Sequence, residues 1–281
     1  MAALTTVLAG DNTTDALFRT WGKAISDQMA AGGWIKTADI GQIDWATVLK
    51  PAAVNTSQGY EIWRSNDAAG SLNQIYVKIE YGSGVAAVAP GLWLTVAFGS
   101  NGSGALTGFM STRTQLAAAG SATPAGLNSY LSVTPGRFSF NMFSQSAYVI
   151  SFHVERTLDI SLNPKNEVLI IGWGGNPTLM NYRQVVSQTE GVFPIVTSNT
   201  IAVALTDANS LQSGAIGLAL IFGQRGALTS PSTNNLGVYS TNLGAAGTVV
   251  AIPIYEVNVN YICLGSVPTL TAPVYMISRY D

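Results

Sequence analysis

The sequence predicts a mainly β protein, with one or more antiparallel domains of the β-sandwich or barrel type and one amphipathic helix near the N-terminus. Short runs in which apolar and polar side chains alternate, such as 74–84, predict the strands. Clusters of Gly, Asn, Ser and Pro separate these runs, as strand connections require. Apolar residues that recur at three- and four-residue spacing predict the helix.

The helix is expected over residues 15–31. Side-chain oxygens at 12–14 can cap its start, and Gly32-Gly33 ends it. Residues 1–33 would thus form an N-terminal arm and helix. In one interpretation this helix caps an end of the β domain; in a sharper one, the arm and helix anchor the chain to a neighbouring subunit. The candidate assembly surface is then the apolar face of the helix, which carries Phe18, Trp21, Ile25 and Met29.

Residues 34–114 are expected to contain an antiparallel meander with strands at 59–67, 74–84 and 92–102. The alternation in the last two runs predicts one face on a core and the other toward water or a partner. Gly82, Gly84 and the Asn101-Gly102 pair are expected to adopt positive φ in the strand connections.

Residues 115–128 are rich in Ala, Gly, Ser, Thr and Pro, which marks a candidate boundary or a long insertion within one domain. Residues 129–281 are expected to form a second β-rich region or to continue the same domain. The apolar run within 166–173 is typical of a strand that is buried on both faces. The strands expected here are 136–142, 148–154, 166–173, 192–196, 200–205, 215–222, 248–257, 261–264 and 273–279.

Composition is the strongest physical indication of function. Charged residues make up only 10% of the 281-residue chain and hydrophobic residues 47%, whereas a quarter of a typical soluble domain is charged. So little charge is natural for a protein that is buried in an assembly. No apolar run has the roughly 20 residues that cross a bilayer as a helix, so membrane insertion is not expected.

Other features of the sequence indicate where the protein is made and which partners and cross-links are not expected. The N-terminus lacks the basic and apolar regions of a signal peptide, so we expect the protein to be made in a cytoplasm. The single cysteine, Cys263, excludes an internal disulfide framework and is expected to be a small core residue. The 13 basic residues are spread thinly and the net charge is −2, so nucleic acid is not an expected partner.

Residues with catalytic potential are scarce. His153, the sole histidine, precedes Glu155 by two positions and could be a general base that a carboxylate orients. The simpler interpretation is a strand histidine hydrogen-bonded to a neighbour, since no Gly-x-Ser-x-Gly sequence supplies a nucleophile. One His and one Cys cannot form a zinc site, and no calcium loop occurs. We therefore expect no cofactor and no metal.

A glycosidase needs only two carboxylates. Cross-strand salt links, with Arg64 and Lys78 nearby, are the ordinary explanation for Glu61 and Glu80. Nothing singles out a catalytic pair, so the protein is expected not to be an enzyme. The available carboxylates are Asp39, Asp44, Glu61, Glu80, Glu155 and Asp159.

Aromatic residues offer a different possibility, since exposed rings can stack on the sugars of a cell-surface glycan. Core or subunit-contact positions are the more ordinary expectation, because rings supply large buried areas there. The tryptophans in question are Trp34, Trp45, Trp63, Trp93 and Trp173.

Two stretches carry a resemblance to a known group. The strings GYEIWRSND and QIYVKIEYGSG, at 59–67 and 74–84, are followed by LWLTVAFGSNGSGALTG. Together they resemble bacteriophage virion proteins described as tail or other structural proteins. The string FRTWGKAISDQMAAGGWIKTADIGQIDWATV at 18–48 is similar to the same group. The resemblance ends near Met110, and its motifs are structural rather than catalytic.

The resemblance implies a non-enzymatic virion component, associated with a tail or baseplate and made in the host cytoplasm. Its partners would be other virion proteins and copies of itself, because phage tail parts commonly follow three- or six-fold symmetry. A capsid decoration protein is an alternative. Another is a receptor-binding protein that recognises host glycan or an outer-membrane protein through loops at 117–128, 174–180 and 226–235. An enzymatic alternative is a glycan depolymerase that uses two of the carboxylates.

Overall fold

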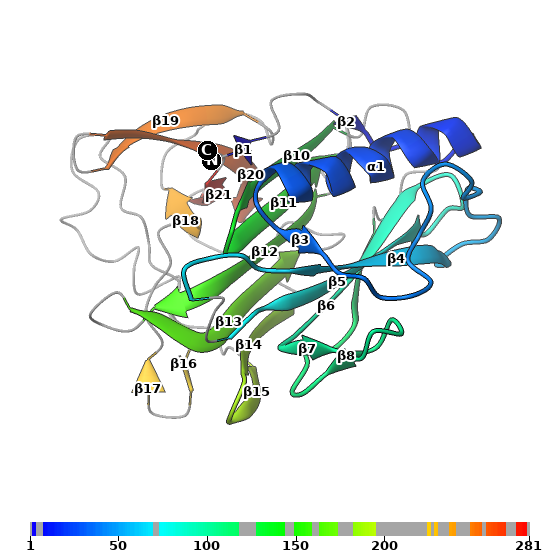
Figure 1. Ribbon diagram of the computed structural model, residues 1–281. Helices are drawn as coiled ribbons and strands as arrows, with labels where there is room; N and C mark the ends of the chain where they lie inside the picture. The colour runs from blue at the N-terminus through cyan, green and yellow to red at the C-terminus, as the bar shows by residue number, and fades with distance from the viewer. Residues whose placement is uncertain are drawn as a thin grey trace.

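The computed structural model confirms the mainly β class, with antiparallel sheets and one helix near the N-terminus (Figure 1). It describes residues 2–3, 8–69, 73–117, 128–143, 149–158, 163–173, 182–194, 224–225, 228–229, 236–239, 248–254, 257–267 and 274–279.

Helix α1 spans Asp15–Ala31, as the sequence predicts. Thr14 is its N-cap: the residue is extended, and its side-chain oxygen accepts a hydrogen bond from the Leu17 N–H at 3.1 Å. Gly32 ends the helix by donating its N–H to the Gln28 carbonyl. Capping at both ends and one apolar face explain why this segment is helical.

A five-stranded sheet has the order β3-β4-β5-β6-β9, and a small hairpin, β7-β8, lies beside it. Their bounds are β3 Ile35–Lys36, β4 Ser57–Arg64, β5 Tyr76–Ser83, β6 Pro90–Ala97, β7 Gly99–Ser100, β8 Leu106–Thr107 and β9 Thr114–Ala117. The three expected strands correspond to β4, β5 and β6.

Strand β6 differs from the expected pattern because all of its residues are buried. Its inward face lies in the main core. On the outward face, Leu106 of the hairpin packs against Ile62 and Ala97, and the Arg113 guanidinium lies 4.9 Å from the centre of the Trp93 ring. A local hairpin and one arginine therefore cover the face that alternation assigned to water or a partner.

Two of the glycines in this region have different roles. Gly102 has a φ of +78°, as expected for the turn between β7 and β8. Gly82, Gly84 and Asn101 do not have a positive φ, which corrects the expectation for those positions. A Cβ on Gly82 would lie 2.0 Å from the Thr56 carbonyl oxygen, so the position requires glycine for close backbone approach.

An eight-stranded antiparallel sheet has β10 near one edge, paired with both β1 and β2, and continues in chain order from β10 to β15. The predicted strands at 136–142, 148–154, 166–173 and 192–196 correspond to β11, β12, β13 and β15. The sequence did not predict the other members. The bounds are β1 Ala2–Ala3, β2 Leu8–Ala9, β10 Asn128–Thr134, β11 Arg137–Phe143, β12 Val149–Leu158, β13 Pro164–Trp173, β14 Tyr182–Ser187 and β15 Gly191–Pro194.

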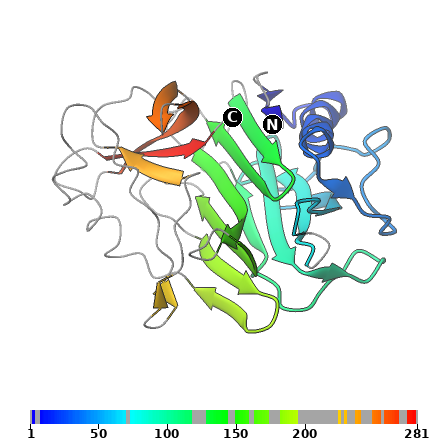
Figure 2. The ribbon, with the colours of Figure 1, turned by 60° about the vertical axis from the view of Figure 1, so that its left-hand side comes forward.

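A four-stranded C-terminal sheet has the order β18-β21-β20-β19. Figure 2 shows the eight-stranded sheet, in green, between the cyan strands of the five-stranded sheet and the orange and red C-terminal strands. The expected strands at 200–205 and 215–222 lie outside the described residues. The bounds are β16 Gln224–Arg225, β17 Leu228–Thr229, β18 Leu236–Tyr239, β19 Val249–Ile254, β20 Val257–Val267 and β21 Val274–Arg279.

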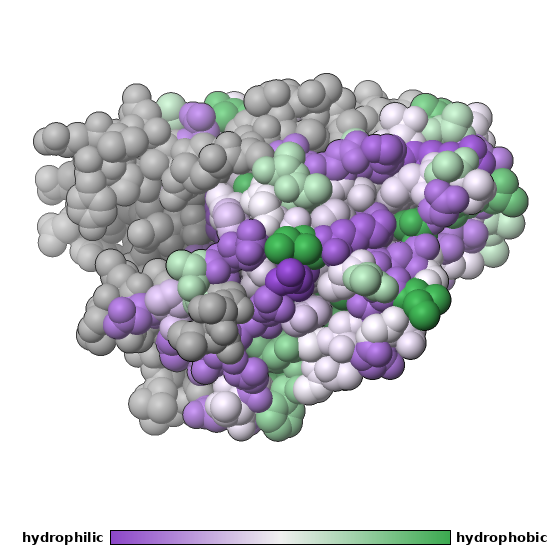
Figure 3. Space-filling model, viewed as in Figure 1, coloured by the Kyte–Doolittle hydropathy of each residue, from purple (hydrophilic) through white to green (hydrophobic). Residues whose placement is uncertain are grey.

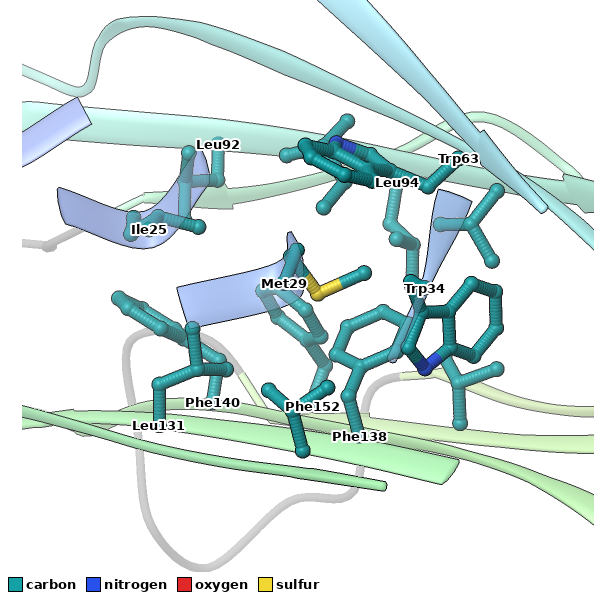
Figure 4. Packing of buried hydrophobic residues seen from close by; sticks show 14 of the residues in the cluster. Ile25, Met29, Trp34, Trp63, Leu92, Leu94, Leu131, Phe138, Phe140 and Phe152 are labelled. Carbon is teal, nitrogen blue, oxygen red and sulfur yellow. The ribbon is translucent and has the colours of Figure 1, made fainter. Parts of the chain in front are cut away.

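The main core lies between the five- and eight-stranded sheets, with α1 packed beside them (Figure 4). Trp34 meets Phe138 edge to face at a ring-centre distance of 5.5 Å, and Phe138 meets Phe152 in the same way at 5.6 Å. The expected regions 34–114 and 129–281 therefore contribute to one hydrophobic core.

An ion pair also joins these two regions. The Arg156 Nε donates to an Asp67 carboxylate oxygen at 2.5 Å, and a second Arg156 nitrogen donates to the Lys165 carbonyl at 3.1 Å. The Arg156 side chain is 4% exposed. This ion pair holds the loop after β4 against β12. Removing either partner would leave the charge of the other without its counter-charge, which is costly in a buried position.

Candidate functional site

The candidate assembly surface on α1 lies in the core of this same chain. Phe18, Trp21, Ile25 and Met29 are each no more than 3% exposed. Figure 4 shows Ile25 and Met29 directed between the side chains of the two sheets. The structure thus uses this face to close the chain's own core, and any surface for a neighbouring subunit has to be formed by other residues.

Helix α1 lies close to the Trp45 ring at Gly22. A Cβ there would lie 2.1 Å from the edge of the Trp45 ring, so the ring occupies space that any other residue on the helix would fill. Trp45 in turn meets Tyr81 edge to face, with ring centres 4.8 Å apart. This contact directs the Trp45 indole N–H toward β4.

Glu61, a fully buried residue of β4, is the carboxylate at the centre of a network of side-chain hydrogen bonds. Its Oε1 accepts hydrogen bonds from Ser26, Lys36 and Trp45, at 2.8, 2.7 and 3.0 Å. Its Oε2 accepts from the Tyr81 hydroxyl at 2.8 Å. The four donors come from α1, β3, a loop and β5, so Glu61 links most of the N-terminal half.

Tyr81 remains a donor in this network. Burial raises the pKa of its hydroxyl well above 10, and the neighbouring Glu61 charge and hydrogen bond raise it further. Both carboxylate oxygens of Glu61 already have donors from the chain, and the network has the features of a structural tie rather than of a general acid or base. The ion-pair partner of Glu61 is Lys36 of the neighbouring strand β3. This is a cross-strand salt link, as the sequence indicated, although it does not involve Arg64.

Glu80 lies on the opposite face of the five-stranded sheet. Arg113 donates to both of its carboxylate oxygens, at 2.7 and 3.0 Å, and is 49% exposed. Lys78, which the sequence indicated as a partner, instead donates to the Gly104 carbonyl at 2.8 Å and lies over the Tyr60 ring. Glu80 therefore forms a surface ion pair, the ordinary role of such a charge.

Asp39 organises the loops beside the β7-β8 hairpin. Burial by itself would raise the pKa of its carboxyl group, but hydrogen bonds from Ser100, Thr37 and the backbone at 102 and 104 outweigh that effect and lower the pKa. The Thr37 hydroxyl is 2.6 Å from one carboxylate oxygen. These hydrogen bonds hold the loops around Asp39 in place, which is a common role of a carboxylate in a loop.

His153 lies in β12 on the face opposite the main core, since its neighbours Phe152 and Val154 point into that core. Its Nε2 is 2.7 Å from a Glu155 carboxylate oxygen, so in the neutral ring this nitrogen carries the proton. The side chain is 1% exposed. Its Nδ1 makes no hydrogen bond among the described residues. The His153–Glu155 contact that a general base would need is present, but in a buried position.

This environment predicts acid sensitivity. Burial lowers the pKa of His153 below 6.5, and the Glu155 hydrogen bond offsets the effect only in part. The unfolded chain then binds a proton more readily than the folded chain, so the contribution of His153 is complete above pH 6.5 and declines as the pH falls toward the folded pKa. We expect the free energy of unfolding, measured with urea, to fall between neutral and mildly acidic pH.

The matched variant is His153→Gln, which keeps a donor for Glu155 and cannot titrate. It should show a shallower decline over the same pH range. Because the chain has one histidine, the difference between the two curves reports this side chain. Identical curves for the two proteins would rule out the assignment.

The remaining candidates are not brought together. Asp44 accepts from the Ala46 N–H and the Thr47 hydroxyl, at 2.9 and 2.8 Å, and so caps a turn. Asp159 lies outside the described residues.

In the part of the chain that the structure describes, no three His, Cys, Asp or Glu side chains form a group that could hold a metal ion. In the same part, no helix combines the length and apolar character needed to cross a membrane.

The tryptophans whose side chains the structure describes do not form an exposed platform. Trp34, Trp63 and Trp93 are each no more than 3% exposed, and Trp45 packs against the core. The side chain of Trp173 and most of the loops at 117–128, 174–180 and 226–235 lie outside the described residues, and so does the side chain of Cys263.

Some large apolar side chains are exposed. Ile40 is 77% exposed and Leu49 62%. On the face in Figure 3, hydrophobic residues stand singly among hydrophilic ones and form no broad patch. Isolated residues of this kind are common on protein surfaces. The other members of the set are Leu17, Val54, Val85, Phe109, Met110 and Val249.

Comparisons with protein-family models, with curated proteins and with solved structures found no match to this chain.

Proposed function

We propose that this protein is a non-enzymatic structural component of a bacteriophage particle, most closely associated with the tail or baseplate, and that it assembles with copies of itself and with other particle proteins. The observation that carries the proposal is the charge content of 10%. A β-rich chain with so little charge has few means of staying dispersed on its own and is suited to burial among other subunits.

The contacts of the charged residues agree with this role. Glu61 and Asp39 are held by donors from several segments, and Glu80 is held by Arg113. Such contacts make a rigid scaffold. The resemblance of 18–48, 59–67 and 74–84 to phage virion proteins supplies the particular setting.

The assembly surface, in this proposal, is formed by loops and sheet edges rather than by α1. Ile40 and Leu49 lie on loops outside the core and are more than half exposed. Burial of such side chains between subunits would contribute about 25 cal/mol for each Å² of apolar surface removed from water.

The test is the composition of purified particles. Phage particles from cells that express this chain would be separated from soluble protein by density-gradient sedimentation, and each fraction analysed by peptide mass spectrometry. We expect peptides of this chain in the particle fractions at a constant ratio to other particle proteins. Recovery only in the soluble fractions, with particles that form and infect without it, would contradict the proposal.

A further inference from the structure

Asn101 and Gly102 lie in the loop that joins the paired strands β7 and β8. Both residues are exposed. Gly102 has a φ of +78°. Apart from its chain neighbours, no atom of the described residues lies within 4 Å of the place that a Cβ on Gly102 would take. The peptide nitrogen of Gly102 is therefore open to approach by the side chain that precedes it.

The Asn101 side chain is fixed against the backbone of this loop. Its Oδ1 accepts hydrogen bonds from the Ser103 N–H at 2.8 Å and from the Ala105 N–H at 3.1 Å. A bond from the N–H two residues further on forms an Asx turn, in which the side chain closes a ring with the backbone. The Asn101 side-chain carbonyl carbon and the Gly102 nitrogen are both members of that ring, so their separation is restricted.

The two N–H donors also suit a reaction at this carbonyl. When a nucleophile attacks the Asn101 side chain, negative charge develops on Oδ1, and fixed backbone N–H groups that point at such an oxygen stabilise the transition state. The Gly102 N–H is directed to the Ser100 hydroxyl at 3.3 Å, and this hydroxyl donates to an Asp39 carboxylate oxygen. The loop thus combines a polarised carbonyl, a neighbouring nitrogen and an acceptor for the proton of that nitrogen.

We propose that Asn101 is a modification site, at which the Gly102 nitrogen attacks the Asn101 side-chain carbonyl and the side chain loses its amide. The new C–N bond closes a five-membered succinimide. The bond to the side-chain nitrogen breaks, and ammonia leaves with the proton that Gly102 gives up. Water then opens the ring at either of its two carbonyls, which yields aspartate or isoaspartate. This inference is independent of the proposed function.

The isoaspartate product would alter the hairpin. It adds one carbon to the main chain of a loop that the Asn101 N–H closes by donating to the Ala105 carbonyl at 3.0 Å. Leu106, the next residue in the chain, packs against Ile62 and Ala97 on the outward face of the five-stranded sheet. Modification would therefore loosen this cover progressively as the protein ages.

The test compares the folded protein with a peptide of the same sequence. The protein and a synthetic peptide of residues 97–107 are incubated in one buffer at neutral pH and at one temperature. Samples taken over time are digested, and mass spectrometry gives the fraction of peptides in which the amide at position 101 has become an acid. Fragment spectra distinguish isoaspartate from aspartate.

We expect both products at position 101, at a rate in the folded protein about tenfold above that in the peptide, because the fixed N–H donors are present only in the folded loop. Asn55, which is exposed and precedes a threonine, is the internal control and should keep its amide. A rate in the protein that is equal to or below the rate in the peptide overturns the proposal. Aspartate without isoaspartate also overturns it.

Two variants test the proton acceptor. Ser100→Ala removes the hydroxyl that accepts the Gly102 N–H, and Ser100→Thr keeps a hydroxyl at the same position. We expect amide loss at Asn101 to slow about tenfold in Ser100→Ala and to return to the original rate in Ser100→Thr. Equal rates in the two variants and the unaltered protein would overturn the assigned role of Ser100.

Discussion

Replacement of Glu61 by Gln should lower the free energy of unfolding by about 2–4 kcal/mol, because the change removes the charge opposite Lys36 and puts an amide donor where a carboxylate accepts. The carboxylate receives four donors in a fully buried position. A single amide oxygen cannot serve Ser26, Lys36, Trp45 and Tyr81 together. Urea unfolding at neutral pH measures the effect.

The matched control is Glu80→Gln, the same substitution in the adjacent strand β5. Its partner Arg113 is half-exposed and can turn to water, so the expected loss is below about 1 kcal/mol. Equal losses of unfolding free energy in the two variants would show that the buried network around Glu61 stabilises the fold no more than the surface ion pair of Glu80 does.

Phe18→Ala should lower the free energy of unfolding by about 3–5 kcal/mol, because it removes a buried ring from the core and leaves a cavity. Phe18 is fully buried, and its ring centre lies 5.9 Å from those of both Trp21 and Trp45. Thermal or urea unfolding gives the value. If the apolar face of α1 stabilises the chain's own core, this decrease in the free energy of unfolding must be observed.

Leu17→Ala is the control on the same helix. Leu17 is 39% exposed, so its truncation should change stability by about 0.5 kcal/mol or less. If α1 instead served as an assembly surface, Phe18→Ala would reduce the mass of the oligomer and leave the stability of the chain nearly unchanged. That result would restore the anchor interpretation.

The sequence contains the local signals for the elements that proved easiest to predict. The spacing of Phe18, Trp21, Ile25 and Met29, with Thr14 before them and Gly32 after, was sufficient for α1. Alternation located β5 and β12. The apolar run at 166–173 was predicted to be buried on both faces, and Val168, Leu169 and Ile170 are buried. In each case the pattern depends on residues close together in the chain.

Features that depend on distant segments could not be predicted in this way. The donors to Glu61 come from residues 26, 36, 45 and 81, and no spacing rule connects them. Strand β10 is the partner of the arm, more than a hundred residues away in the sequence. The cover on the outward face of β6 is close in the chain, but the alternation within β6 does not show that Leu106 and Arg113 fold back over it.

The mass of the purified chain in solution is the most direct test of the central claim, that this protein works by assembly. Light scattering would be recorded over a range of concentrations at neutral pH. We expect a defined multiple of the 29.4 kDa chain mass, stable on dilution. A mass of one chain at every concentration, for a protein that remains soluble and folded, would contradict the account.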